Sequence, residues 1–118
     1  MKLNYITLGT NNMQAAIMFY DSLFDATGVS QIVSGGRMTL WQGDEFMFAV
    51  AEPFNGEQAT VGNGSMVGFN VGSVDEVRKL YKRALELGGV SEGEPGIRSD
   101  RFSAYARDLD GNKLCFFE

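Results

Sequence analysis

The stretch FSAYARDLDGNKLCFFE, residues 102–118, decides the fold, because it joins two apolar runs through a polar tract. Asp110-Gly111 lies at the centre of that tract. Asp-Gly between β-prone residues is a strong hairpin signal, since the turn needs residues that tolerate positive φ. The sequence predicts that residues 102–107 pair antiparallel with residues 113–117. The second of these strands is apolar on both faces, so we expect both of its sides to be covered.

The composition is that of one globular domain. The chain has 118 residues, of which 44% are apolar and 21% charged. Its net charge is −5 and no basic run occurs, so we expect no nucleic-acid partner. No stretch approaches the roughly 20 apolar residues of a membrane span, and the N-terminal residues show no signal-peptide pattern. One cysteine allows no intramolecular disulfide, which suits a reducing compartment, so we expect a cytoplasmic protein. Because no apolar span is present, we expect no membrane partner.

Histidine is absent from the chain, and this limits the possible chemistry of the protein more than any other feature of its composition. Histidine is the commonest imidazole metal ligand and the usual general base near neutral pH. Its absence excludes Ser-His-Asp and Cys-His nucleophilic systems, and any zinc site that depends on imidazole nitrogen.

The first half of the chain has the pattern of a strand, a helix and three strands. Between the first two strands, apolar residues recur at helical spacing from Met13 to Phe24. Either Asn11 or Asn12 can cap this helix, and Gly28 ends it. The strands are predicted at residues 3–8, 31–33, 37–41 and 45–51.

The second half starts the same order again. Residues 52–64 are rich in glycine, and we interpret them as a linker before a strand at residues 65–71. Ser73 and Glu76 then fit the capping box of a helix that Gly88-Gly89 ends. Residues 91–101 are polar and are expected to form a loose segment before the closing hairpin.

The two halves align as an internal repeat. The helix caps Asn12 and Ser73 match at an offset of 61 (73−12), and the turn glycines Gly43 and Gly111 at an offset of 68 (111−43). The difference of 7 residues fits an insertion in the segment 91–101.

This duplicated βαβββ pattern resembles the vicinal-oxygen-chelate superfamily, which includes glyoxalase I, extradiol dioxygenases and bleomycin resistance proteins. The resemblance covers nearly the whole chain. The matching stretches are Tyr5-Ile6-Thr7-Leu8-Gly9, Met18-Phe19-Tyr20, Val67-Gly68-Phe69-Asn70-Val71 and Arg107-Asp108-Leu109-Asp110-Gly111-Asn112-Lys113, the last being similar to the "RDPDGN" of the family.

The resemblance implies an α+β fold of two βαβββ modules in tandem within a single domain of residues 1–118. The first module would span residues 1–51 and the second residues 65–118. In that fold each module is a curved mixed sheet with its helix on the convex face, and the concave faces form a cup that holds a ligand. Leu114 and Phe116 would then meet a helix, while Cys115 and Phe117 would line the cup.

The family's metal enzymes place histidine or glutamate on the concave side of four strands. Carried over by position, these sites fall on Tyr5, Met47, Met66 and Cys115. None of these is an imidazole or a carboxylate, and a thioether is a poor ligand for Zn²⁺, Ni²⁺, Mn²⁺ or Fe²⁺. We therefore expect no metal and no other cofactor, and we assign no catalytic residue.

The candidate ligand-binding residues have alternative interpretations. Cys115 is interpreted as a buried, inert thiol rather than a nucleophile. Trp41 is interpreted as pocket wall or dimer surface rather than core. Met47 and Met66 either shape an adaptable pocket or fill the space that a metal would occupy. Arg107 has an uncertain facing, and it could pair with Asp108 or Asp110 to fix the turn. The candidate set is Tyr5, Trp41, Met47, Met66, Asn70, Tyr105 and Cys115.

The leading functional hypothesis is a metal-free homodimer that binds an apolar or aromatic small molecule, in the manner of bleomycin resistance proteins. One alternative is a glyoxalase-like lyase or dioxygenase-related enzyme with a nonstandard site, working either through an unusual metal or through Tyr5 without metal. Another is a partner-binding protein whose cup is vestigial, which large aromatic side chains filling the cavity would favour.

Overall fold

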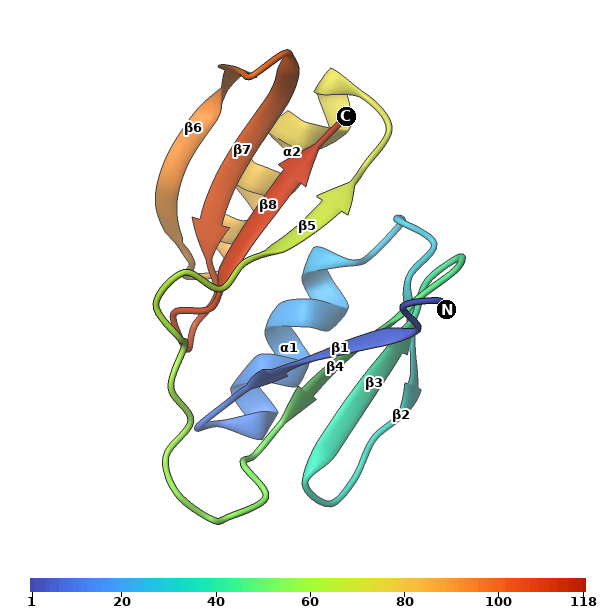
Figure 1. The fold of residues 1–118 in the computed structure, drawn as a ribbon, viewed down its shortest axis with the longest axis vertical. Helices are drawn as coiled ribbons and strands as arrows, with labels where there is room; N and C mark the ends of the chain where they lie inside the picture. Colours follow the sequence, from blue (N-terminus) through green and yellow to red (C-terminus); the bar gives the residue numbers. More distant parts are fainter. The chain divides into compact units, whose positions relative to one another are not determined.

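The computed structural model describes residues 1–118, which divide into two compact units, residues 1–60 and 61–118. The division falls inside the segment 52–64, the expected linker. Each unit contains one helix and one four-stranded mixed sheet, in the order strand, helix, three strands (Figure 1). The α+β fold of two βαβββ modules is therefore confirmed. Neither helix is long and apolar enough to cross a membrane.

Unit 1 is built on a sheet with the strand order β1-β4-β3-β2. Strands β1 and β4 are parallel, and the other neighbours are antiparallel. The elements are β1 (Tyr5–Gly9), α1 (Met13–Leu23), β2 (Ser30–Val33), β3 (Met38–Gln42) and β4 (Met47–Ala51).

The two asparagines before α1 have different tasks. Asn12 caps the helix, because its side chain accepts a hydrogen bond of 3.1 Å from the Ala15 backbone N–H. Asn11 binds Ala59 instead: its Oδ1 accepts from the Ala59 N–H at 2.7 Å and its Nδ2 donates to the Ala59 carbonyl at 3.1 Å. The segment that follows β4 is thereby held against the start of α1.

Trp41 lies in the core of unit 1, so its interpretation as pocket wall or dimer surface is wrong. Its side chain is 0% exposed, and its ring centroid lies 5.7 Å from that of Tyr20 and 6.0 Å from that of Phe48. The indole Nε1 donates to the Asp21 carboxylate at 2.9 Å. Because Tyr20 and Asp21 belong to α1, Trp41 projects from the sheet face that the helix covers, where its polar N–H still has a partner.

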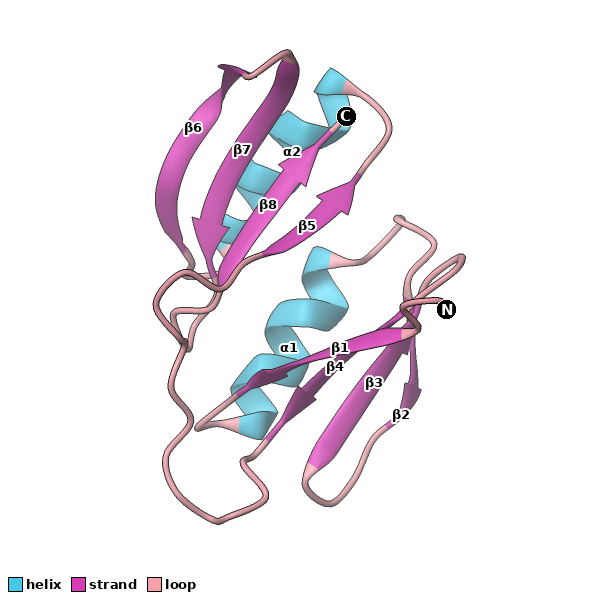
Figure 2. Ribbon diagram, viewed as in Figure 1, coloured by secondary structure: helices cyan, strands magenta, loops and turns pink.

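Unit 2 repeats the arrangement with the strand order β5-β8-β7-β6, again with its first and last strands parallel (Figure 2). The hairpin of β7 and β8 has the expected register, with Ala104 opposite Phe116 and Arg107 opposite Lys113. The elements are β5 (Val67–Asn70), α2 (Val74–Glu86), β6 (Val90–Arg98), β7 (Arg101–Arg107) and β8 (Lys113–Phe117).

The expected loose segment 91–101 is wrong, because β6 occupies most of it. This strand lies at the edge of the sheet and pairs only with β7. Its register shifts between Ser91 and Gly93 and again between Gly93 and Gly96. An edge strand tolerates bulges, and it tolerates Pro95 because one side needs no ladder hydrogen bonds. The glycine and proline content that suggests a loop therefore marks an irregular edge strand.

The β7–β8 turn is organised by a buried carboxylate. Asp108 is 5% exposed, and its Oδ1 accepts from the backbone N–H groups of Asp110 and Asn112, both at 2.9 Å. Its Oδ2 accepts from the Asn112 side-chain amide at 3.0 Å. Gly111 has a φ of +92°, a conformation that favours glycine. The hairpin loop is thus longer than a two-residue turn, and the Asp108 carboxylate accepts hydrogen bonds from the backbone N–H groups of that loop.

Candidate functional site

Each sheet has a face that its own helix leaves open, and we call these the open faces of unit 1 and unit 2. In unit 2 the covered face is identified by Arg78 of α2, whose guanidinium lies 4.9 Å from the Phe102 ring centroid. Side chains alternate along a strand, so Ala104 and Ala106 also face the helix, and both are 0% exposed. Their neighbours on β7, Ser103, Tyr105 and Arg107, therefore point to the open face.

Cys115 and Phe117 occupy the open face of unit 2, as expected. In the antiparallel register, Cys115 lies opposite Tyr105 and Phe117 opposite Ser103. Leu114 and Phe116 point the other way, toward α2, and are 0% and 1% exposed.

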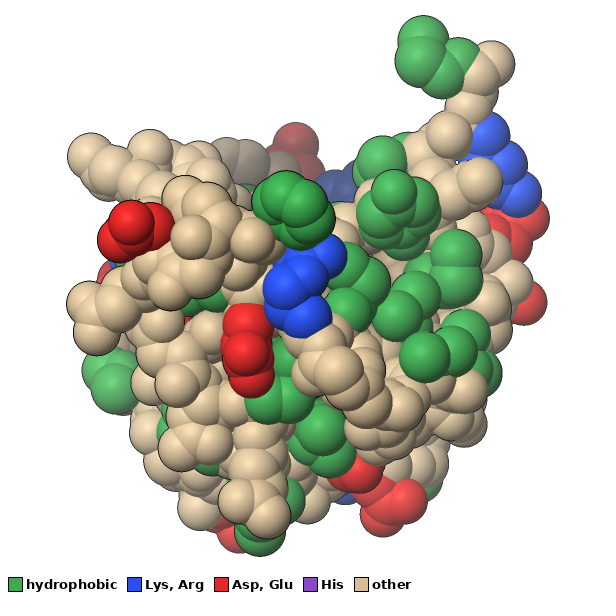
Figure 3. Space-filling view, turned by 90° about the horizontal axis from the view of Figure 1, so that it is seen from below, with side chains coloured by type: hydrophobic (Ala, Val, Ile, Leu, Met, Phe, Trp, Pro, Cys, Tyr) green, Lys and Arg blue, Asp and Glu red, His purple; other side chains and the backbone are tan.

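The open face of unit 1 is mainly apolar. Tyr5 lies opposite Met47 in the parallel β1–β4 pair, and Thr7 lies opposite Ala49. Leu40 of β3 lies opposite Ala49 on the other side. Tyr5 is 58% exposed and Met47 is partly exposed, so both side chains are accessible. Elsewhere, exposed apolar side chains include Ile32, Val33 and Phe54, and Figure 3 shows hydrophobic side chains reaching the surface in neighbouring patches.

The sheet registers give a different alignment of the last strands from the turn offset of 68, which would match Met47 with Cys115 (115−47). In unit 1, Ile6 lies opposite Phe48, and in unit 2 Val67 lies opposite Leu114. The first strands therefore match at an offset of 61 (67−6) and the last strands at 66 (114−48). The offset of 68 that relates the turn glycines Gly43 and Gly111 therefore does not apply to the strands that follow them, β4 and β8.

With the offset of 66, the counterpart of Met47 is Lys113, and the counterpart of Cys115 is Ala49 (113−47 and 115−49). Tyr5 and Met66 remain counterparts at the offset of 61 (66−5). The repeated open-face positions are thus filled by tyrosine, methionine, alanine, lysine and cysteine side chains.

The metal implied by the family does not fit this donor set. Neither Tyr5 and Met47 in unit 1 nor Met66, Lys113 and Cys115 in unit 2 offer a carboxylate or an imidazole. Moreover, no three Cys, Asp or Glu side chains anywhere in the chain are grouped so that they could hold an ion. Thioether sulfur and a lysine ammonium are poor partners for the divalent ions of metal-dependent lyases and dioxygenases.

Cys115 has the properties of an inert thiol. It is a free cysteine, 5% exposed. Burial raises the pKa of the thiol, and this outweighs a hydrogen bond with Tyr105 and the charges of Arg98 and Lys113, which lower it. The side chain therefore stays protonated near neutral pH, where a thiol is a weak nucleophile.

The open face of unit 2 carries cations that sequence analysis did not assign to the site. The Arg98 guanidinium carbon lies 5.1 Å from the Tyr105 ring centroid, and the Lys113 Nζ lies 5.4 Å from the same centroid. Arg101 lies 4.9 Å from the ring centroid of Phe117. Period-two alternation along β7 is the one sequence signal that relates Arg101 and Arg107 to Tyr105, and the sequence analysis left the facing of Arg107 uncertain and did not place Arg101. The position of Arg98 depends on the bulges of β6, which have no clear sequence signature.

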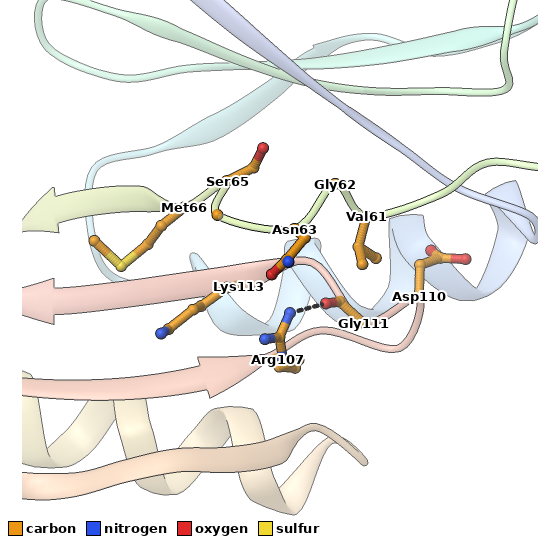
Figure 4. A pocket seen from close by; sticks show the side chains of 10 residues that line it. Val61, Gly62, Asn63, Ser65, Met66, Arg107, Asp110, Gly111 and Lys113 are labelled. Carbon is orange, nitrogen blue, oxygen red and sulfur yellow. Dashed lines mark hydrogen bonds between the residues drawn. The ribbon is translucent and has the colours of Figure 1, made fainter.

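A pocket of about 660 Å³ lies at the end of this face (Figure 4). In Figure 4, Arg107 extends from β7 toward the loop 61–65 and the Asn63 side chain points from that loop toward the strands, whereas the Lys113 ammonium points away from the loop. Met66 also borders the pocket and is 49% exposed, so it lines an accessible surface. The complete lining is Val61, Gly62, Asn63, Gly64, Ser65, Met66, Arg107, Asp110, Gly111 and Lys113.

Arg107 fixes the turn, but through a backbone carbonyl and a partner on β6. Its Nη1 donates to the Gly111 carbonyl at 2.8 Å, and its Nε lies 2.6 Å from Glu92 Oε1. The hydrogen bond and charge of Arg107 hold the pKa of Glu92 below its ordinary value. The expected ion pair with Asp108 or Asp110 is therefore replaced by one with Glu92.

Asn70 has a structural hydrogen bond at the end of β5. Its Oδ1 accepts from the Gly72 backbone N–H at 3.1 Å, and Gly72 has a φ of +89°. The residue lies opposite Phe117 and is exposed, so it belongs to the edge of the open face. The candidate residues thus separate into two open faces: Tyr5 and Met47 belong to unit 1, and Met66, Asn70, Tyr105 and Cys115 to unit 2.

Comparison with known proteins identifies the class to which this architecture belongs. A family model described as the glyoxalase/bleomycin resistance protein/dioxygenase superfamily matches residues 2–116. The chain therefore belongs to this superfamily. No curated protein matches the chain.

Solved structures show the same fold. The chain is similar to a glyoxalase/bleomycin resistance protein from Albidiferax ferrireducens T118, with 32% identity, a TM-score of 0.90, and 98% of this chain and 96% of that chain covered. A glyoxalase-related enzyme from Fulvimarina pelagi has 22% identity and a TM-score of 0.83, with 99% and 87% covered. Lactoylglutathione lyase from Agrobacterium tumefaciens has 18% identity and a TM-score of 0.75, with 99% and 92% covered. At these lower identities the likeness concerns the fold.

Proposed function

We propose that this protein binds a small molecule on its open sheet faces without the help of a metal ion. The observation that carries the proposal is the chemistry of the side chains at the repeated open-face positions, none of which is a carboxylate or an imidazole. These positions are occupied by Tyr5, Met47, Ala49, Met66, Lys113 and Cys115. These side chains offer apolar surface, one phenol and one ammonium. Such a lining suits a ligand held by burial and a few polar contacts.

Accessibility supports binding over a vestigial face. Met66 and Tyr5 are 49% and 58% exposed, whereas the large aromatic residues Trp41, Phe48 and Phe116 are at most 1% exposed and point toward the helices. These three rings therefore belong to the cores, and the rings on the open faces are those of Tyr5, Tyr105 and Phe117. Burial of about 200 Å² of apolar ligand surface would contribute about 5 kcal/mol before ordering costs, enough for modest affinity.

The proposal includes a homodimer in the cytoplasm. Pairing of two chains would provide cover for open faces that the helices leave uncovered. The buried, protonated Cys115 suits a reducing compartment because it forms no disulfide.

A screen of small aromatic fragments by amide NMR, carried out in EDTA, tests this function. We expect fragments to shift the amide signals of Met47, Ala49, Gly68 and Cys115 while EDTA is present. Shifts that appear only after Ni²⁺ or Zn²⁺ is added would favour a metal-dependent enzyme instead. An absence of shifts under both conditions would contradict small-molecule binding and favour a partner-binding protein.

A further inference from the structure

The open face of unit 2 concentrates positive charge in a chain whose net charge is −5. Four of the ten Lys and Arg residues reach it: Arg98, Arg101, Arg107 and Lys113. Arg107 is paired with Glu92, but the other three form no ion pair. Three of the four cations lie outside any ion pair, so this face carries positive charge that can attract an anion.

Aromatic rings hold these cations without neutralising them. Arg98 and Lys113 both lie against the Tyr105 ring, at 5.1 and 5.4 Å from its centroid. A cation–π contact orients a charged group but leaves its full charge available. Arg98 donates Nη1 to the Ser103 carbonyl and Nη2 to the Glu94 carbonyl, both at 2.8 Å. A guanidinium has five N–H donors, so these two bonds fix its position and leave donors for a ligand.

The adjoining pocket has room for the rest of a ligand. Lys113 lies both against Tyr105 and in the lining of the 660 Å³ pocket, together with Met66. Glu92 pairs with Arg107, and the charge of Lys113 also lowers the pKa of Glu92, while Asp110 lines the pocket beside the turn. Neither Arg98 nor Lys113 forms an ion pair with a carboxylate, so both cations remain available to an anion.

We propose that the open face of unit 2 binds the anionic group, a carboxylate or a phosphate, of an aromatic small molecule. Arg98 and Lys113 bind the anion, and the rings of Tyr105 and Phe117 contact its aromatic part. This inference rests on the proposed function, since it names the chemical class of the ligand for the same open face.

Three probes with the same ring test the charge preference: benzoate, phenyl phosphate and neutral benzyl alcohol, each titrated into the full chain and followed by amide NMR. We expect at least one anion to bind about tenfold more tightly than benzyl alcohol, with shifts at Tyr105 and Cys115. Comparison of benzoate with phenyl phosphate distinguishes a carboxylate ligand from a phosphate ligand. Raising the salt from about 0.05 M to about 0.5 M should weaken the anions but not the alcohol.

Lys113→Gln provides the mutational test, and Lys79→Gln is its matched control on the exposed side of α2. Lys113→Gln should weaken the preferred anion by about tenfold and leave benzyl alcohol unchanged, whereas Lys79→Gln should change neither. Arg98→Gln risks unfolding because Arg98 binds two backbone carbonyls, so Arg98→Lys is added, which keeps the charge and should retain part of the affinity.

Equal binding of all three probes would overturn the anion site while leaving the proposed small-molecule function intact. Failure of every probe to shift the open-face amides would also overturn the anion site. The fragment screen in EDTA would then test small-molecule binding independently. Equal loss of anion affinity in Lys113→Gln and Lys79→Gln would show a non-specific charge effect and would likewise contradict the site.

Discussion

Asp108 shows how a single buried carboxylate can determine a turn. It accepts two backbone N–H groups and one side-chain amide within five residues of chain, and it is nearly inaccessible to water. Without it, the Asp110 and Asn112 N–H groups would lose the hydrogen bonds that this carboxylate accepts. A buried donor that loses its acceptor costs more than the hydrogen bond itself contributed.

Asp108→Ala should therefore lower the free energy of unfolding by about 2–4 kcal/mol. Urea denaturation followed by circular dichroism measures the change. Glu86→Ala, an exposed position at the end of α2, is the control and should change stability by less than about 0.5 kcal/mol. A loss below about 1 kcal/mol in Asp108→Ala would mean that water replaces the carboxylate in the turn.

Glu92 gives stability a defined dependence on pH. The hydrogen bond and charge of Arg107 hold the pKa of Glu92 below its ordinary value of 4.5 in the folded chain. A depressed pKa in the folded state adds stability that is present above 4.5 and is lost as pH falls through the folded pKa.

Glu92→Gln should therefore be less stable than the wild-type chain at pH 7, and the difference should shrink as the pH falls below 4.5. Because the carboxylate is exposed, we expect the effect to be small and reduced by salt. Thermal denaturation across a pH series measures it, with Glu86→Gln as the control. A difference that stays constant with pH would exclude the Arg107 pair as its source.

At the scale of the elements, the last strand, β8, contributes to the core with one face and to the candidate binding site with the other. Phe116 and Phe117 are neighbours on β8, but Phe116 is 1% exposed against α2 while Phe117 is partly exposed on the open face. The same substitution at adjacent positions thus tests the core and the candidate site separately.

Phe116→Ala should cost about 3–5 kcal/mol of stability, because it leaves a cavity beneath α2. Phe117→Ala should cost about 1 kcal/mol and reduce the affinity for aromatic ligands instead. Urea denaturation and a fragment titration measure the two quantities. Equal stability losses would show that the open face of unit 2 is packed as tightly as the core.

Helices and strands that are marked by hydrophobic periodicity or by turn and cap residues could be predicted from the sequence. Those whose position depends on tertiary contacts could not. The 102–117 hairpin and the caps Asn12 and Ser73 are local signals, and the structure confirms them. Strand β6 has no apolar alternation, because it is an exposed edge that pairs through bulges. Trp41 was assigned to the wrong face because both sides of β3 carry apolar residues, so alternation alone does not identify the side that meets α1.

The candidate site shows the same limit. The family resemblance identified the open-face strands, and alternation placed Cys115 and Phe117 correctly. The position of Arg98 over Tyr105 follows from hydrogen bonds to the Ser103 and Glu94 carbonyls across an irregular strand. No spacing rule predicts that contact, so the positive charge of the face was apparent only from the structure.

At the scale of the whole molecule, we expect a homodimer. Its open faces and the exposed Ile32 and Val33 of β2 offer apolar surface that a second chain would bury. Light scattering at micromolar concentration should give about twice the chain mass of 12.9 kDa. A mass near 12.9 kDa would contradict the dimer and would require each chain to bind its ligand alone.

We propose that this member of a superfamily with metal-dependent enzymes binds its ligand without metal. Elemental analysis of protein purified without chelator, combined with thermal denaturation in EDTA, tests it most directly. We predict far less than one Ni, Zn, Mn or Fe per chain and the same denaturation midpoint with and without EDTA, because Tyr5, Met66 and Cys115 supply no suitable donor set. About one such ion per chain, with a midpoint that falls when EDTA removes it, would contradict the claim.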